Sequence, residues 1–211
     1  MIKDFKTSLD GKLVLVTGAG RGIGRAMALA FARRGCRLAI CSLHEEKIQE
    51  TAKMAQELGA EVFAAKVDVK SESDCLSFIA ETERELGLVE ILINNAGIFV
   101  GTPLEEQSSA SWQEVLDTNL NSAFYFCRSA IAGMKKSGWG RIINISSVSG
   151  KQGEMNAAAY SASKFAMIGM SQSLALELAS SGITVNAICP GSVETDMSKG
   201  HLSCPPESRH E

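Results

Sequence analysis

The chain has 211 residues, enough for one α/β domain with a sizeable core. Its formal net charge of −3 and its lack of a long basic run argue against nucleic acid as a partner. No apolar run approaches the ~18 residues of a membrane helix, and the first six residues lack the long apolar region of a signal peptide. Six cysteines without a Cys-x-x-Cys motif are typical of a reduced chain without zinc. We therefore expect a cytoplasmic protein with no metal site and no membrane partner.

Short apolar strands alternate with helical patterns along the chain. The predicted strands lie at 12–17, 37–41, 61–66, 89–93, 140–146 and 183–189, and the predicted helices at 22–34, 44–58, 72–86, 111–136 and 157–181. Ser71 with Asp74, and Ser111 with Glu114, have the spacing of helix N-caps. This alternation predicts the α/β class, with a doubly wound parallel sheet of about six strands covered by helices on both faces.

A glycine-rich turn separates the first strand from the first helix. The turn has the sequence Thr17-Gly18-Ala19-Gly20-Arg21-Gly22-Ile23-Gly24. Glycines let backbone amides approach a pyrophosphate, and the N-terminus of the following helix supplies the positive end of its dipole. The turn therefore predicts a dinucleotide site, with a tight turn that binds nothing as the alternative. A P-loop is excluded because no Gly-Lys-Ser/Thr follows.

A tyrosine and a lysine stand four residues apart in the last predicted helix. This spacing places the side chains of Tyr160 and Lys164 on one helical face. A free phenol has a pKa of about 10 and is a poor acid or base at neutral pH. A neighbouring ammonium favours the phenolate, so we expect Lys164 to lower the pKa of Tyr160. Taken alone, the pair is also typical of a solvated helix face.

Six motifs, in order along the chain, resemble those of the short-chain dehydrogenase/reductase family. The matches are the Thr-Gly-x-x-x-Gly-x-Gly turn at 17–24, the Asn-Asn-Ala-Gly motif at 94–97, Asn119, Ser147 thirteen positions before Tyr160, Tyr160 with Lys164, and Pro190-Gly191. The resemblance covers residues 8 to about 200. It implies a Rossmann-like fold and an NAD(P)-dependent oxidoreductase that transfers a hydride between a nicotinamide dinucleotide and a carbonyl or secondary alcohol.

The resemblance also implies a role for each catalytic residue. Ser147 would bind the substrate oxygen, and Tyr160 would deliver or remove the proton. Lys164 would bind the nicotinamide ribose and lower the pKa of the phenol, while Asn119 would hold a water linking Lys164 to solvent. Ser147 follows a predicted strand at its carboxyl end, where ligands bind in open α/β sheets. From the residues alone, Ser147 could instead cap a turn, Ser146 could take its place, and Asn119 could be a solvated polar residue.

Further positions match the family's dinucleotide contacts. The cofactor-binding residues implied by the resemblance are Thr17, Gly18, Gly20, Arg21, Gly22, Ile23, Gly24, Ser42, Asp68, Val69, Asn95, Ala96, Gly97, Tyr160, Lys164, Pro190, Gly191, Val193 and Thr195. NAD-selective members usually carry a carboxylate where this chain has Ser42. Arg21 resembles the basic residue that many NADP-dependent members place in the turn, and a guanidinium suits a 2′-phosphate. We therefore favour NADP(H) over NAD(H), with a solvent-exposed Arg21 as the alternative.

The segment at 182–197 resembles bacterial 3-oxoacyl thioester (3-oxoacyl-acyl-carrier-protein) reductases. Ser181 stands where those enzymes often carry a basic residue that docks the carrier protein, so a sugar, a polyol or another small ketone stays open as substrate. The resemblance also implies a homo-oligomer, at least a dimer, through the two longest helices. The apolar residues that could form its interface, or belong to the core, are Leu116, Ala123, Phe124, Met167, Ile168 and Met170.

The end of the chain departs from the family pattern. No further helix or seventh strand is recognisable after residue 200, and Pro205-Pro206 disfavour both. We predict one dinucleotide-binding and catalytic domain at 1–200, an irregular or disordered tail at 201–211, and an open sheet edge where a seventh strand would pair. The alternative function is therefore a truncated, inactive nucleotide-binding or regulatory protein of the same fold.

A serine hydrolase is the main rival for a serine-bearing α/β fold. None of His44, His201 and His210 is placed as the base of a nucleophile, and no Gly-x-Ser-x-Gly elbow is present. Clustered metal ligands are also missing from the sequence. Hydrolysis and metal catalysis are therefore disfavoured, and a purely structural interaction module remains as a third class.

Overall fold

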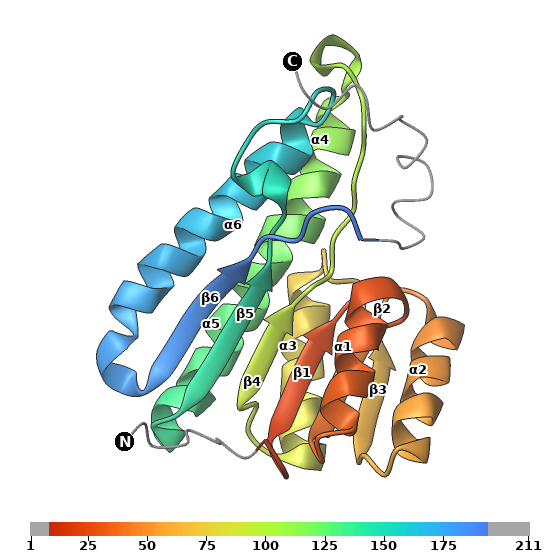
Figure 1. The fold of residues 1–211 in the computed structure, drawn as a ribbon, viewed down its shortest axis with the longest axis vertical. Coiled ribbons are helices and arrows are strands. Elements are labelled where there is room, and N and C mark those ends of the chain that lie inside the picture. Colours follow the sequence, from red (N-terminus) through yellow and green to blue (C-terminus); the bar gives the residue numbers. More distant parts are fainter. Residues whose placement is uncertain (1–8, 194–211) are drawn as a thin grey trace.

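The computed structural model describes residues 9–193, whose six strands form one parallel sheet in the order β3-β2-β1-β4-β5-β6 (Figure 1). The strands are β1 (Leu13–Thr17), β2 (Arg37–Ser42), β3 (Val62–Lys66), β4 (Ile91–Asn94), β5 (Gly140–Ile145) and β6 (Ile183–Ile188). The chain runs outward from β1 to β3 and then returns to place β4 on the other side of β1. This order confirms the predicted doubly wound sheet and puts its switch point between β1 and β4, where such sheets bind ligands.

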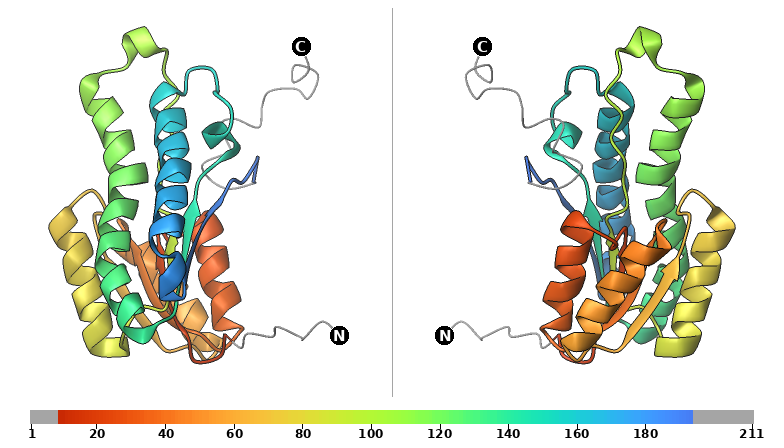
Figure 2. Two further views of the ribbon diagram at one scale, coloured as in Figure 1. Left: turned by 90° about the vertical axis from the view of Figure 1, so that its left-hand side faces the viewer. Right: turned by 90° about the vertical axis from the view of Figure 1, so that its right-hand side faces the viewer.

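Helices cover both faces of this sheet (Figure 2). They are α1 (Gly22–Ala32), α2 (Glu45–Glu57), α3 (Glu72–Leu86), α4 (Ser109–Leu116), α5 (Ser122–Ser137) and α6 (Ala158–Glu177). Successive residues of β1 point to opposite faces, as in any strand. Leu13 and Leu15 belong to a core shared with α3, α5 and the end of α6, whereas Val14 and Val16 belong to a core shared with α1 and α2. All five residues of β1 are buried, as expected for a central parallel strand.

The helix predicted at 111–136 is not a single α-helix. A π-helical segment, Asp117–Asn121, separates α4 from α5. The cap predicted at Ser71 is confirmed, because its hydroxyl accepts a hydrogen bond from the Asp74 N–H at 3.2 Å. The cap predicted at Ser111 is wrong: α4 begins two residues earlier, and Ser108 accepts the hydrogen bond from the Ser111 N–H at 3.1 Å. π-helical segments of this kind are frequently found at functional sites.

The strand β6 lies at an edge of the sheet formed by the described residues. Thr184, Asn186 and Ile188 are exposed on one face of β6, with Ile188 48% exposed. The tail predicted at 201–211, and the segment in which a seventh strand was not recognised, lie outside the described residues. Within residues 9–193, no helix combines the length and apolar character needed to cross a bilayer.

The apolar residues predicted for a subunit interface fall into two groups. Ala123 and Met167 are each 1% exposed and belong to the core of the chain. Phe124 is 44% exposed on α5, and the others are half-buried. Phe124 is therefore the clearest member of the set that could meet a partner.

Candidate active site

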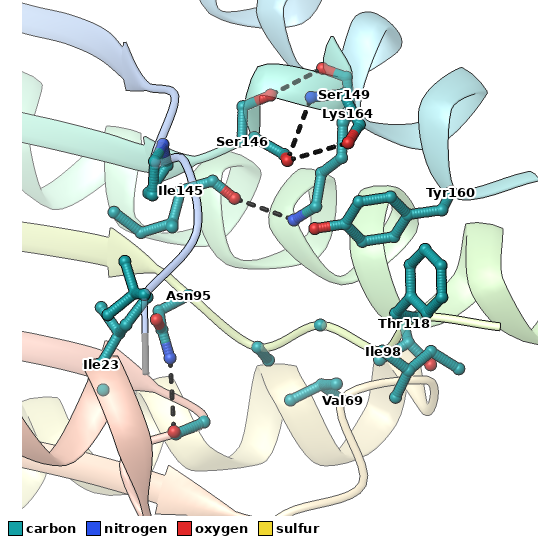
Figure 3. Close-up of a pocket in the computed structure, with 18 of the residues that line it drawn as sticks. Ile23, Val69, Asn95, Ile98, Thr118, Ile145, Ser146, Ser149, Tyr160 and Lys164 are labelled. Atoms are coloured by element: carbon teal, nitrogen blue, oxygen red, sulfur yellow. Dashed lines mark hydrogen bonds between the residues drawn. The ribbon is translucent and has the colours of Figure 1, made fainter. Parts of the chain in front are cut away.

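A large cavity opens at the carboxyl ends of the strands (Figure 3). Its volume of about 690 Å³ lies in the range typical of ligand pockets. The predicted cofactor residues that line it are Gly18, Gly20, Arg21, Ile23, Gly24, Ser42, Asp68, Val69, Asn95, Ala96, Gly97, Tyr160, Lys164, Pro190, Gly191 and Val193. Ser147 lines it as well, whereas Thr17, Gly22 and Asn119 do not. Thr195 lies outside the described residues.

The glycine positions of this turn leave little room for a side chain. Gly18 and Gly22 have φ angles of +65° and +54°, which L side chains rarely adopt. A Cβ atom on Gly24 would lie 2.3 Å from the carbonyl oxygen of Gly18, and one on Gly20 would lie 2.7 Å from Ser42 Oγ. The backbone can therefore come close to a ligand at the N-terminus of α1, as binding of a dinucleotide pyrophosphate requires. Gly22 contributes through its backbone conformation rather than as a wall of the cavity.

Thr17 and Asn95 hold the glycine turn against the loop that follows β4. Thr17 Oγ1 accepts hydrogen bonds from the N–H groups of Asn95 and Ala96, both at 3.0 Å. Asn95 Nδ2 donates to the carbonyl oxygens of Thr17 and Gly18 at 2.9 and 3.3 Å. Because Thr17 is only 2% exposed, it shapes the cavity from behind instead of lining it.

Asn119 ties the π-helical segment to the loop after β4. Its Nδ2 donates to the Ile98 carbonyl oxygen at 2.9 Å and to Ser163 Oγ at 3.1 Å, and its Oδ1 accepts from the Ile98 N–H at 2.8 Å. The side chain is fully buried, so it is not the solvated polar residue that the sequence left open. The π turn positions this amide between Ile98 and Ser163 of α6.

Lys164 extends from α6 toward the end of β5 (Figure 3). It is 3% exposed, and its Nζ donates a hydrogen bond to the Ile145 carbonyl oxygen at 2.9 Å. Removal of the ammonium from water lowers the pKa of Lys164 to about 8, although the nearby Cys189 acts in the opposite direction. The Nζ lies 5.5 Å from the centre of the Tyr160 ring, so the predicted pair does share one end of the cavity.

The pKa of Tyr160 is raised, which is opposite to the expected direction. Burial is the largest cause because it disfavours the phenolate; a hydrogen bond from Ser147 lowers the pKa, and the negative charge of Glu154 raises it. The expectation of a lowered pKa is therefore wrong here, since desolvation of the phenol dominates. The phenol also packs edge-to-face against Phe99, with ring centres 5.1 Å apart.

The two adjacent serines after β5 have different roles. Ser146 Oγ donates to the Lys164 carbonyl oxygen at 2.9 Å, which ties the end of β5 to α6. Ser147 Oγ accepts from the Ser149 N–H at 3.1 Å and also lies near the Tyr160 phenol. Ser147 thus caps a turn, as one reading of the sequence allowed, and lines the cavity beside Tyr160 as well.

Comparison with known proteins indicates the same family as the sequence motifs. The short chain dehydrogenase family model matches residues 12–203. The chain belongs to the short-chain dehydrogenase family. It is 40% identical to the 3-oxoacyl-acyl-carrier-protein reductase FabG of Escherichia coli K12 over 192 residues, covering 91% of this chain and 78% of FabG. It is 42% identical to nodulation protein G of Azospirillum brasilense over 190 residues, covering 90% of this chain and 77% of that protein.

A solved structure agrees with the fold of this short-chain dehydrogenase. Xylitol dehydrogenase with bound NAD+ superposes with a TM-score of 0.84 at 35% identity, over 87% of this chain and 71% of that chain. Family membership makes the protein an NAD(P)-dependent oxidoreductase that acts on carbonyl compounds or alcohols. Among residues 9–193, no group of three or more His, Cys, Asp or Glu side chains could hold a metal ion.

The dehydrogenase cavity contains residues that motif matching missed. At one end, His44 and Lys47 join Arg21 and Ser42 in the wall, and a Cβ atom on Gly20 would lie 3.2 Å from Lys47 Cβ. At the other end, the wall includes Phe99, Gln152 and Glu154. The position of Lys47 in the first turn of α2, shortly after Ser42, was an available signal. Nothing in the local sequence indicated Phe99 or Glu154.

Proposed function

We propose that this short-chain dehydrogenase reduces a ketone to a secondary alcohol, with NADPH as the preferred cofactor. The observation that carries the proposal is the convergence of Ser147, Tyr160 and Lys164 in the wall of a cavity that also takes in the glycine turn. Bound NADPH supplies the hydride. The chain must then hold the ketone, orient its oxygen and provide one proton.

Tyr160 would provide the proton. Its raised pKa keeps the phenol protonated at neutral pH, which suits a general acid in the direction of reduction. Ser147, held in place by its hydrogen bond from the Ser149 N–H, would donate a hydrogen bond to the ketone oxygen. Lys164 would bind the nicotinamide ribose, and its buried ammonium would stabilise negative charge that develops on the phenol oxygen.

The remaining cofactor contacts follow the cavity wall. The backbone of the glycine turn would hold the pyrophosphate, while Asp68 and Val69 line the part of the cavity that would take the adenine. Pro190, Gly191 and Val193 would lie along the carboxamide side. Thr195, which the family resemblance assigns to the carboxamide, lies outside the described residues. Asn119 would act as a positioning residue through Ile98 and Ser163.

The preference for NADPH is supported by the residues around Ser42. Its hydroxyl, in place of a carboxylate, accepts a hydrogen bond from the His44 N–H at 3.2 Å. Arg21 and Lys47 line the same part of the cavity, and cationic side chains favour a 2′-phosphate. A carboxylate at residue 42 would repel that phosphate instead.

We also propose that the enzyme is at least a dimer, contacts its partner subunit through α5 and α6, and works in the cytoplasm. The exposed Phe124 on α5 supports the interface, and light scattering with size-exclusion chromatography measures the mass. A 3-oxoacyl thioester is one candidate substrate, because the chain is 40% identical to FabG. Small ketones are the other.

The proposal is tested by separating cofactor binding from turnover. NADPH and NADH fluorescence is titrated with the protein, and oxidation is then followed with a panel of ketones that includes an acetoacetyl thioester. The variant Tyr160→Phe, which keeps the ring but removes the proton, should lower kcat/KM by about 10²- to 10⁴-fold while NADPH binding stays within about threefold. Binding without oxidation of any ketone by the wild type would favour the inactive, regulatory alternative.

A further inference from the structure

The segment between β5 and α6 forms the substrate side of the cavity. Val148, Ser149, Gln152, Gly153 and Glu154 all line the cavity. The segment is anchored at both its ends, because Ser146 is bonded to α6 and the Ala157 N–H donates to the Glu154 carbonyl oxygen at 3.3 Å.

The same segment is also joined to the loop after β4. Asn156 has a φ of +57°, and its carbonyl oxygen accepts from the Thr102 N–H at 2.7 Å. The backbone around Glu154 is therefore defined by contacts on two sides. Glu154 is an exposed residue that also lines the cavity wall.

Glu154 is linked to the catalytic serine through one intermediate residue. Ser149 Oγ donates to Glu154 Oε2 at 2.7 Å, and Ser147 Oγ donates to Ser149 Oγ at 3.3 Å. A carboxylate offers about four acceptor sites, and Ser149 is the hydrogen-bond partner of Glu154 among the described residues. No lysine or arginine within residues 9–193 forms an ion pair with Glu154.

The charge of Glu154 acts on the reacting end of the cavity. It is near enough to Tyr160 to oppose ionisation of the phenol. Arg21 and Lys47 belong to the end near the glycine turn, and Lys70 is paired with Glu114 at 3.1 Å. Lys151 lines a different cavity, beside β6. Lys164 lies at the same end, with its Nζ bonded to the Ile145 carbonyl oxygen. The substrate side therefore combines the apolar ring of Phe99 with a carboxylate that forms no ion pair within residues 9–193.

We propose that Glu154 is a specificity-determining residue that selects uncharged α-hydroxy ketones, which the enzyme would reduce to vicinal diols. With the ketone oxygen at Ser147 and Tyr160, a hydroxyl on the neighbouring carbon lies toward Ser149 and Glu154, because these groups follow one another at hydrogen-bond spacing. The hydroxyl donates to the carboxylate, whereas the carboxylate of a keto acid is repelled by it. Bound NADPH would supply the hydride to the carbonyl carbon, the C=O π electrons would move onto the oxygen, and that oxygen would take the Tyr160 proton.

This inference rests on the proposed function, and three small substrates test it. Hydroxyacetone carries the donor, methoxyacetone keeps the electron-withdrawing oxygen but lacks the donor, and pyruvate carries a negative charge. The wild type should prefer hydroxyacetone to methoxyacetone by about tenfold or more in kcat/KM, as for a hydrogen bond to a charged group. Pyruvate should be the poorest of the three substrates.

Variants then locate the cause of this preference. Glu154→Ala and Glu154→Gln should each lower the ratio of hydroxyacetone to methoxyacetone by at least about fivefold, and should improve pyruvate relative to hydroxyacetone. Glu105→Gln is the matched control, because Glu105 is exposed on a short turn and does not line the cavity. It removes the same charge and should leave the ratios unchanged.

The outcomes separate this inference from the proposed function. Equal use of hydroxyacetone and methoxyacetone by the wild type, or ratios unaltered in both Glu154 variants, overturns the role of Glu154. Reduction of an acetoacetyl thioester without any reduction of hydroxyacetone also overturns it but leaves the proposed function standing. Because the wild-type preference needs no mutation, the inference remains testable if a variant does not fold.

Discussion

Replacing Lys164 with methionine should stabilise the protein at neutral pH when no cofactor is added. Lys164 is 3% exposed, and its Nζ donates a hydrogen bond to the Ile145 carbonyl oxygen within the described part of the chain. Within residues 9–193 it forms no ion pair with a carboxylate. A buried ammonium with so little compensation opposes folding. Methionine keeps the unbranched stem and removes the charge.

The magnitude follows from the pKa of Lys164. Burial lowers this pKa from 10.5 to about 8, and each pKa unit corresponds to about 1.36 kcal/mol, so the charge opposes folding by about 3 kcal/mol. This destabilisation by the Lys164 charge is complete below pH 8 and disappears as the pH rises to 10.5. Between these pH values Lys164 keeps its proton in the unfolded chain and loses it in the folded chain. The lost hydrogen bond offsets about 1 kcal/mol. The variant should therefore gain about 2 kcal/mol at pH 7 and nothing near pH 10.

Urea unfolding, followed by circular dichroism at pH 7, 8.5 and 10, measures this difference. Lys53→Met is the matched control, since Lys53 is exposed on α2, and it should change the free energy of unfolding by less than about 0.5 kcal/mol at each pH. A Lys164→Met variant less stable than the wild type at pH 7 would refute the reasoning. So would a difference that does not depend on pH.

Two further substitutions probe the cofactor end of the site. Ser42→Asp should lower the ratio of kcat/KM for NADPH to that for NADH by about tenfold or more, because a carboxylate repels the 2′-phosphate; an unchanged ratio, or an equal change in the exposed control Ser77→Asp, contradicts the assignment. Gly24→Ala would place a Cβ atom 2.3 Å from the Gly18 carbonyl oxygen, so it should destabilise the chain by about 2 kcal/mol or more and weaken binding of either cofactor. Gly169→Ala, where α6 has open space, should instead stabilise by roughly 0.5–1 kcal/mol in the same urea-unfolding assay and leave the cofactor fluorescence titration unchanged. Similar behaviour of the two glycine variants would argue against a close approach of backbone at the turn.

Local patterns in the sequence determined the architecture and most of the cavity wall. Apolar runs alternating with helical periodicity indicated all six strands. The signal is clearest for β1, β2 and β4, because a central parallel strand is buried on both faces and leaves little freedom in its composition. The glycine turn was predicted because only glycine permits that backbone and that close approach. The shared position of Tyr160 and Lys164 followed from helical geometry alone.

The tertiary structure decided properties that depend on surroundings contributed by distant segments. The direction of the Tyr160 pKa was mispredicted, because a four-residue spacing reveals the neighbouring lysine but not the desolvation of the phenol or the charge of Glu154. The hydrogen bonds of Asn119 to Ile98 and Ser163 could not be predicted, because these residues come together only in the folded chain, at the π turn. Glu154 acquires its place beside Ser149 from a turn held by Asn156 and Thr102. Burial and electrostatics depend on all the groups that surround a residue in the folded chain, whereas strand, helix and turn preferences depend on residues that are consecutive in the sequence.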